Sequence, residues 1–261
     1  MSIDPNSTKR SNRIRGYDAI RGLSVISMVG FHLCYDLVYL YGTGPSWFAP
    51  PLQDVWRSSI SWVFLLIAGI MATYSRSNLK RACRYLAAAL AIFVVTSVAS
   101  VDTPINYGII YCMGFSTLVA WVVQKETPKE LTVLGRVMAA AICAMAFLLC
   151  LGIPTATFGL KQIGGPYVRV PPAPYASGLL SWLGFPGPRF ASGDYYPPIP
   201  FTLLYLSGYF LGGIIQKSGH ATEALSRLRC RPLEFIGRHA LEVYVIHQPL
   251  ILLVLTLAFG R

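Results

Sequence analysis

The stretch RIRGYDAIRGLSVISMVGFHLCYDL, residues 13–37, decides how this chain folds. Its basic start runs into an apolar run, and a bilayer crossing needs roughly 20 mostly apolar residues. The run nevertheless carries four ionisable side chains, Asp18, Arg21, His32 and Asp36. The whole chain is 54% hydrophobic and only 13% charged, whereas a soluble domain carries about 25% charged residues. One soluble core cannot hide so much apolar surface, so the composition predicts an integral membrane protein.

The apolar runs predict an all-α fold, a polytopic transmembrane helix bundle with about seven spans. We expect residues 1–261 to form a single membrane domain, with 1–16 as a basic cytoplasmic segment. A long loop, 154–197, is rich in glycine, proline and aromatic residues, which favours a packed lid over a linker. Within it, residues 175–185 are too short to cross and predict an interfacial or re-entrant helix. The expected spans are 17–41, 58–75, 82–100, 107–124, 132–153, 198–216 and 233–259.

The distribution of Lys and Arg predicts a cytoplasmic N-terminus, because cytoplasmic loops of membrane proteins are enriched in both. The net charge of +11 then reflects topology and attraction to anionic lipids, and it needs no nucleic acid partner. The first apolar run is too long for a cleavable signal, so we expect it to stay as a span. With this orientation the outer side holds only Arg57, Lys161, Arg169, Arg189 and Arg261. The cytoplasmic side holds Lys9, Arg10, Arg13, Arg15, Arg76, Lys80, Arg81, Arg84, Lys125, Lys129, Arg136, Lys217, Arg227, Arg229, Arg231 and Arg238.

The cysteines predict reduced thiols. By this topology all of them lie in spans or on the cytoplasmic side, and no two form a C-x-x-C pair. We therefore expect no zinc or other metal site and no tightly bound cofactor. The six positions are 34, 83, 112, 143, 150 and 230.

The polar residues of the first span follow one face of the helix. Arg21 and His32 are eleven positions apart, which places them only about 20° from the same face and about 16 Å apart along the axis. Asp36 follows His32 by one turn, so the two side chains can meet, and Tyr35 lies beside them. Arg21 alone could be an arginine that reaches for the head groups. A histidine and a carboxylate inside a span are functional by default, so the stripe predicts a site.

The stripe contains Arg-x10-His, RGLSVISMVGFH at 21–32, and so resembles the signature of the membrane-bound acyltransferase-three family. The wider segment 13–37 is more similar to the bacterial relatives of heparan-alpha-glucosaminide N-acetyltransferase. So are WVFLLIAGI (62–70), INYGIIYCMGFSTL (105–118) and PLEFIGRHALEVYVIHQPL (232–250). The chain departs from the lysosomal enzyme, whose catalytic histidine belongs to the loop after the first span. The corresponding loop here, YGTGPSWFAPPLQDVW (41–56), has no histidine, which makes His32 the natural candidate.

The resemblance implies a multi-pass acyltransferase in a bacterial plasma membrane. Its donor would be cytoplasmic acetyl-CoA or another acyl-CoA, and its acceptor a sugar or a lipid-linked group on the outer side. Arginine binds phosphates well, so the donor site would draw on Arg21, Arg15, Arg81, Arg84, Arg238 and His239. His32 would be the general base and Asp36 its orienting partner; a covalent acyl-His intermediate stays open. Candidates for acceptor binding are Asp18, Tyr35, Asp54, Arg57, Asn106, Asp194 and His247.

Two other classes compete with the enzyme. One is a small-molecule or proton-coupled transporter that uses the buried Arg, His and Asp residues as a relay. The sequence shows no internal repeat, which weakens that reading. The other is a non-catalytic membrane partner. Assembly as a homodimer and the identity of the acceptor, whether polysaccharide, peptidoglycan sugar or lipid head group, are left open by the sequence.

Overall fold

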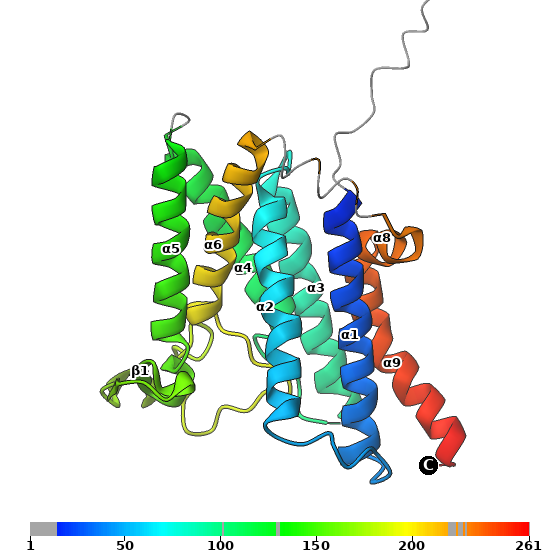
Figure 1. Cartoon of the computed structure of the whole chain (residues 1–261). Coiled ribbons are helices and arrows are strands. Elements are labelled where there is room, and N and C mark those ends of the chain that lie inside the picture. The colour runs from blue at the N-terminus through cyan, green and yellow to red at the C-terminus, as the bar shows by residue number, and fades with distance from the viewer. Residues whose placement is uncertain are drawn as a thin grey trace, which may run out of the picture. The chain divides into compact units, whose positions relative to one another are not determined.

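A computed structural model describes residues 15–100, 102–128, 131–218, 223, 227 and 229–260. The fold is mostly helical (Figure 1). The helices are α1 (Arg15–Tyr39), α2 (Leu52–Ala72), α3 (Asn78–Ala99), α4 (Ile109–Glu126), α5 (Val133–Cys150), α6 (Pro198–Lys217), α8 (Arg231–Arg238) and α9 (Ala240–Phe259).

Six helices of the described chain, α1, α2, α3, α5, α6 and α9, are long and apolar enough to cross a membrane. The predicted span 107–124 forms α4, which has 18 residues and ends in the polar sequence Gln124-Lys125-Glu126. That polar end lowers its mean hydropathy, so α4 does not join the six. Large apolar side chains on α3, α5 and α9 are exposed, among them Val98, Leu134 and Leu257 at 71–79%. Lipid is the solvent that suits such surfaces.

The prediction of one span over 233–259 was wrong. The segment is divided between α8 and α9, because His239 adopts a non-helical conformation with φ −103° and ψ 29°. Helix α8 is held separately by a close approach to α1. A Cβ atom on Gly22 would lie 2.0 Å from the carbonyl oxygen of Leu233, and one on Gly237 would lie 1.8 Å from that of Asp18. Only glycine permits this contact in either helix.

The contacts within the chain define two compact units, which are described separately below. Unit 1 comprises residues 1–44 and 218–261 and contains α1, α8 and α9. Unit 2 comprises residues 45–217 and contains α2 to α6. The expectation of a single domain over 1–261 stays a prediction.

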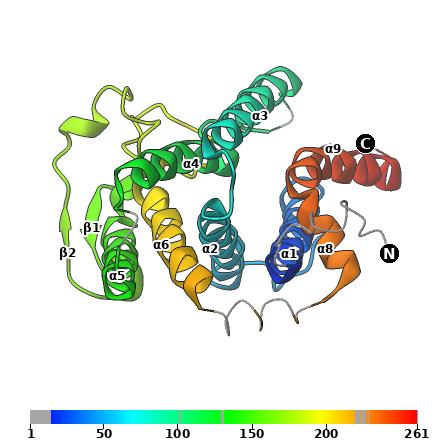
Figure 2. The ribbon, with the colours of Figure 1, turned by 90° about the horizontal axis from the view of Figure 1, so that it is seen from above.

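In unit 2, α6 lies between α2 and α5, and α4 lies beside α6 and α3 (Figure 2). Helices α2 and α6 run in the same direction, since a Cβ on Gly208 would meet the carbonyl of Leu66, and one on Gly212 that of Ile70, four residues on in each helix. Glycine at 208 and 212 allows this close packing of the two helices. Between α4 and α6, hydrogen bonds join Ser116 to Thr202 at 2.9 Å.

The loop between α5 and α6 departs from the all-α expectation. It contains a small antiparallel sheet of β1 (Thr157–Gly159) and β2 (Tyr167–Arg169), in which Phe158 is paired with Val168. The remaining regular elements are three short 3₁₀ helices, η1 (Ile153–Thr155), η2 (Lys161–Ile163) and η3 (Ala173–Tyr175). Residues 175–185, where we expected a short helix, form turns after η3. Glycine at 178 and 184 with positive φ favours turns there.

Candidate active site

The centre of the candidate site is a pair of histidines in unit 1. The rings of His32 on α1 and His247 on α9 have their centroids 4.9 Å apart at an interplanar angle of 60°. Nine residues further along the chain in each case, just past the end of α1 and within α9, the hydroxyl groups of Tyr41 and Thr256 are 3.0 Å apart. The two contacts show that α1 and α9 run in the same direction, side by side. His247 is 7% exposed and His32 is half-buried.

The tautomer of His247 follows from its hydrogen bond. Nδ1 lies 2.6 Å from the carbonyl oxygen of Tyr244, and a carbonyl can only accept. The proton of the neutral ring is therefore on Nδ1, so Nε2 carries the lone pair. His32 makes ring contacts with Phe31 and His247 but no hydrogen bond with another described residue.

Asp36 is 1% exposed and accepts a hydrogen bond of 2.9 Å from Nε2 of Gln248 on α9. We had expected Asp36 to orient His32 one turn away on the same helix. The structure shows the Asp36 carboxylate bonded to α9, at Gln248, the residue that follows His247 in the sequence. Asp36 thus ties α9 to α1 at the level of the histidine pair. Tyr35, a predicted acceptor contact, packs on Tyr39 with ring centroids 4.8 Å apart.

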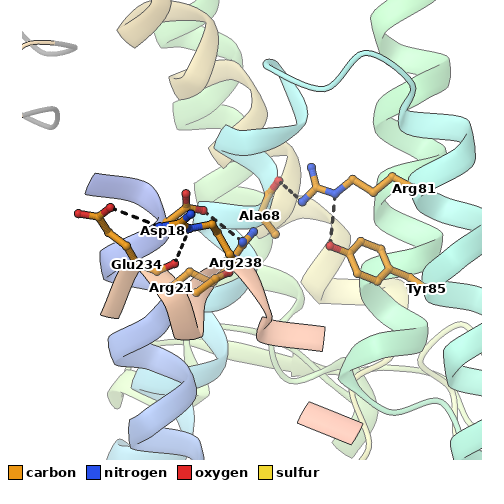
Figure 3. Close-up of polar contacts among 8 residues, drawn as sticks. Asp18, Arg21, Ala68, Arg81, Tyr85, Glu234 and Arg238 are labelled. Atoms are coloured by element: carbon orange, nitrogen blue, oxygen red, sulfur yellow. Dashed lines mark hydrogen bonds and ion pairs between the residues drawn. The ribbon is translucent and has the colours of Figure 1, made fainter. Parts of the chain in front are cut away.

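A second polar cluster occupies the N-terminal end of α1 (Figure 3). Asp18, 2% exposed, forms an ion pair of 3.3 Å with Arg21. Arg21 also donates through Nε to the carbonyl oxygen of Gly237 on α8. Glu234, 3% exposed, pairs with Arg238 at 3.7 Å. Asp18 and Arg21 therefore help to hold α8 against α1. Their roles in acceptor and donor binding stay predictions.

Three exposed basic residues of unit 1 lie near this cluster in the sequence of α1 and α8. Arg15, Arg238 and His239 are exposed. The side chain of Arg238 is 48% exposed even though it contacts Glu234, and that of His239 is 50% exposed near Glu242. Arg15 and Arg238 are therefore better placed than Arg21 to meet a phosphate.

Two further predicted donor residues belong to unit 2. Arg81 on α3 donates to the hydroxyl of Tyr85 at 3.3 Å and to the carbonyl oxygen of Ala68 on α2 at 3.5 Å (Figure 3). These bonds hold α3 near α2. Arg84 is exposed and makes no hydrogen bond or ion pair with a described residue. Of Arg81 and Arg84, only Arg84 has a guanidinium group that is not bonded to another described residue.

The predicted acceptor residues of unit 2 fall in two places. Asp54 and Arg57 form an exposed ion pair of 3.2 Å on α2. Asp194 accepts a hydrogen bond of 3.0 Å from the backbone of Ile109, the first residue of α4, where the helix dipole favours a carboxylate. The backbone of Asn106 is bonded in both directions to the hydroxyl of Ser192. Asp194 and Asn106 are thus brought together, and Asp54 with Arg57 forms a separate surface pair.

Two residues of these clusters were not predicted from the sequence. Gln248 and Glu234 were not proposed, although both contact predicted residues. The only sequence signal was their position in the segment 232–250, which carries the resemblance. In the described part of the chain, no three His, Cys, Asp or Glu residues are grouped so that they could hold a metal ion, and all six cysteines are free. His220, Lys129 and the basic residues before Arg15 lie outside the described residues.

Comparison with known proteins gives a family match. Residues 13–249 match the family described as "Heparan-alpha-glucosaminide N-acetyltransferase, catalytic". No curated protein and no solved structure matches the chain. The matched region includes the stripe of α1, all of α8 and the His247–Gln248 pair of α9. Because the match covers nearly the whole sequence, the chain belongs to the heparan-alpha-glucosaminide N-acetyltransferase catalytic family.

Proposed function

We propose that the chain is a membrane-embedded acetyltransferase that passes an acetyl group from cytoplasmic acetyl-CoA to a sugar acceptor on the other side of the membrane. Family membership supports the reaction class and the donor. The observation that carries the proposal for this chain is the contact between His32 and His247. Two imidazoles and the buried carboxylate of Asp36 lie between otherwise apolar helices. Ionisable groups inside membrane spans are energetically costly and rare, and they usually mark a functional site.

His32 would act as the general base. Its ring has no hydrogen-bond partner among the described residues, so a ring nitrogen is available to an acceptor hydroxyl or amine. As His32 takes the acceptor's proton, the acceptor oxygen or nitrogen attacks the thioester carbonyl. The bond to sulfur then breaks and CoA leaves as the thiolate, which takes up a proton. The unprotonated Nε2 of His247 could take the proton on from His32.

Asp36 would act as a positioning residue. Its bond to Gln248 fixes the residue next to His247 and so keeps the two rings at their separation. The negative charge would also stabilise an imidazolium formed during the reaction. This logic resembles that of a hydrolase triad without its serine.

The donor's phosphates would bind at the N-terminal end of α1. The exposed side chains of Arg15, Arg238 and His239 supply the positive charge, and guanidinium groups suit phosphate oxygens. Arg21 would act indirectly by holding α8 in place through Gly237. Since Arg21 and His32 are about 16 Å apart along the axis, a flexible donor bound there would reach toward the histidines. Arg81 and Arg84 stay candidates from unit 2.

The decisive experiment is acetyl transfer by the purified full chain in lipid nanodiscs. Radiolabelled acetyl-CoA is supplied with a glucosamine trimer, a lipid head-group amine or no acceptor, and labelled product is separated. Transfer to the sugar is expected. If acetyl-CoA is never consumed while the protein is folded, the acetyltransferase proposal fails. A proton-coupled transporter built on the histidine pair would then be the better account.

A further inference from the structure

A separate aromatic cluster lies in unit 2, where the segment before α4 meets the end of the long loop. Tyr107 stacks on Phe190 with ring centroids 6.0 Å apart and an interplanar angle of 17°. Tyr107 also contacts Tyr111 at 5.1 Å, and Phe190 contacts Tyr195 at 4.8 Å. All four rings are half-buried, so each keeps an accessible part. We refer to Tyr107, Tyr111, Phe190 and Tyr195 as the aromatic cluster.

The cluster is held rigidly by backbone contacts between segments far apart in sequence. The N–H of Tyr196 donates to the carbonyl of Tyr107 at 3.0 Å, and the N–H of Gly193 donates to that of Pro104 at 3.2 Å. Tyr195 donates its hydroxyl to the carbonyl of Ser181 at 2.7 Å. Burial, with Tyr107, Tyr175 and Tyr111 close by, raises the pKa of the Tyr195 phenol. The ring of Tyr195 is therefore held in a fixed position within the cluster.

The backbone of Tyr107 is strained. Its φ is +56°, in the left-handed region that a bulky residue rarely adopts. Such conformations cost free energy and are often found where a side chain must be presented to a ligand. The hydrogen bond from Tyr196 to the Tyr107 carbonyl is one of the contacts that hold this conformation.

Polar groups without internal partners surround the rings. The side-chain amide of Asn106 makes no hydrogen bond with a described residue, and its backbone alone contacts Ser192. The hydroxyls of Tyr107 and Tyr111 likewise have no hydrogen-bond partner in the described part of the chain, and neither is shut off from solvent. Half-buried aromatic residues next to an amide and hydroxyls without internal partners fit one chemical class. A pyranose sugar presents an apolar C–H face for a ring and hydroxyls for the polar groups.

We infer that the aromatic cluster with Asn106 is a carbohydrate-binding site, which takes a pyranose of the acceptor. The assignment to the acceptor rests on the proposed function; the binding of sugar does not. A stacked ring at Tyr107 fixes the sugar plane, and the amide of Asn106 selects its hydroxyl or amine pattern.

The test is saturation-transfer NMR on the full chain in nanodiscs, with a glucosamine trimer as the probe. Cellobiose is added as a neutral pyranose, and sorbitol as a polyol without a ring face. Tyr107→Ala and Tyr111→Ala are the test variants; the second lies inside α4 and leaves the strained turn intact. The matched control is Tyr167→Ala, which removes a tyrosine that is 49% exposed on β2 of the same unit. Unchanged melting temperatures show that the variants fold.

Saturation transfer from the protein to the trimer or cellobiose, and none to sorbitol, is expected. Loss of a stacked ring should weaken sugar binding roughly three- to tenfold in Tyr107→Ala and Tyr111→Ala, with no change in Tyr167→Ala. Absence of sugar binding by the wild type, or equal binding by a folded Tyr107→Ala, overturns the inference. Sugar binding without any acetyl transfer would refute the proposed function and leave this site standing. If Tyr107→Ala and Tyr111→Ala transfer acetyl groups with an unchanged KM for the sugar, the proposed function stands and the sugar site is refuted.

Discussion

The rings of His32 on α1 and His247 on α9 lie 4.9 Å apart, although 215 residues (247 − 32) separate them in the chain. The contact places two titratable side chains of unit 1 side by side between α1 and α9. It also gives His32 a neighbour that can accept a proton, because the Nδ1 proton of His247 is directed to the Tyr244 carbonyl. A pair of this kind can share the proton that an acceptor loses.

Replacing His32 with Ala is expected to slow acetyl transfer by 10²–10⁴-fold, the usual contribution of a general base. Binding of acetyl-CoA should change little, because the donor's phosphates are expected at the other end of α1. Single-turnover transfer from labelled acetyl-CoA measures the first quantity, and calorimetry the second. Leu33→Ala, an exposed neighbour on the same helix, is the matched control. Transfer at the wild-type rate in His32→Ala would move the base to His247 or His239.

Because Asp36 and Gln248 share a hydrogen bond, we expect the effects of replacing either residue on protein stability to be coupled. Asp36→Ala leaves the half-buried amide of Gln248 without its acceptor and should lower the free energy of unfolding by about 1 kcal/mol, since helices in a membrane keep other partners when they separate. Asp36→Asn keeps an acceptor oxygen and should cost less. Thermal unfolding in detergent of Asp36→Ala, Gln248→Ala and the double variant forms a double-mutant cycle. Additive losses would show that the bond does not contribute to stability.

The roles of Arg238 and Arg21 in the donor site can be tested with separate variants. Arg238→Lys keeps a cation beside the buried Glu234 but loses the planar guanidinium, so it should weaken acetyl-CoA binding severalfold without lowering the melting temperature much. Arg21→Ala breaks the contacts to Asp18 and Gly237 and should lower the melting temperature as well. Calorimetric titration and a thermal shift assay on both variants measure these effects. Arg57→Ala, at an exposed pair in unit 2, serves as the control. If Arg21→Ala weakens binding at unchanged stability, Arg21 is a direct ligand.

Gly22 and Gly237 give a test of the α1–α8 contact. Alanine at either position places Cβ within 2.0 Å of a backbone carbonyl oxygen, so the helices must move apart. Overpacking of this kind typically costs about 1–3 kcal/mol, and acetyl transfer should fall with it. Gly135→Ala on α5 is the control, since its nearest neighbour is the flexible side chain of Leu131. A melting temperature of Gly237→Ala equal to the wild type would refute the close packing of α8.

The membrane class and most of the helices could be predicted from sequence, because apolar run length and helical spacing are local properties. Asp36 shows the limit of such reasoning. Its spacing from His32 permits a contact along the helix, yet its partner is Gln248, which only the packing of α9 on α1 brings near. The same holds for His247, whose role depends on a neighbour 215 residues away.

Two other features depend on contacts that the sequence did not reveal. The run 233–259 is apolar enough to read as one span, but the glycine contact at Gly237 and the non-helical His239 divide it. Asp194 was predicted as an acceptor residue because it is a polar group in a long loop. The structure shows that it accepts a hydrogen bond from the start of α4, and no pattern near Asp194 could indicate a partner 85 residues earlier.

The orientation of the chain is the last prediction. The distribution of Lys and Arg favours a cytoplasmic N-terminus, with the loop 154–197 on the outer side. Because α2 and α6 run in the same direction, Ser177 in the loop before α6 and Arg76 after α2 lie at opposite ends of this pair. Both positions are exposed. Single cysteines at each, in a background without the six natural cysteines, can therefore report the two faces of the membrane separately. In intact cells an impermeant maleimide should label Ser177→Cys at once and Arg76→Cys only after lysis. The reverse pattern would place the basic loops outside, and acetyl-CoA from the cytoplasm could then not reach the cluster at Arg15 and Arg238.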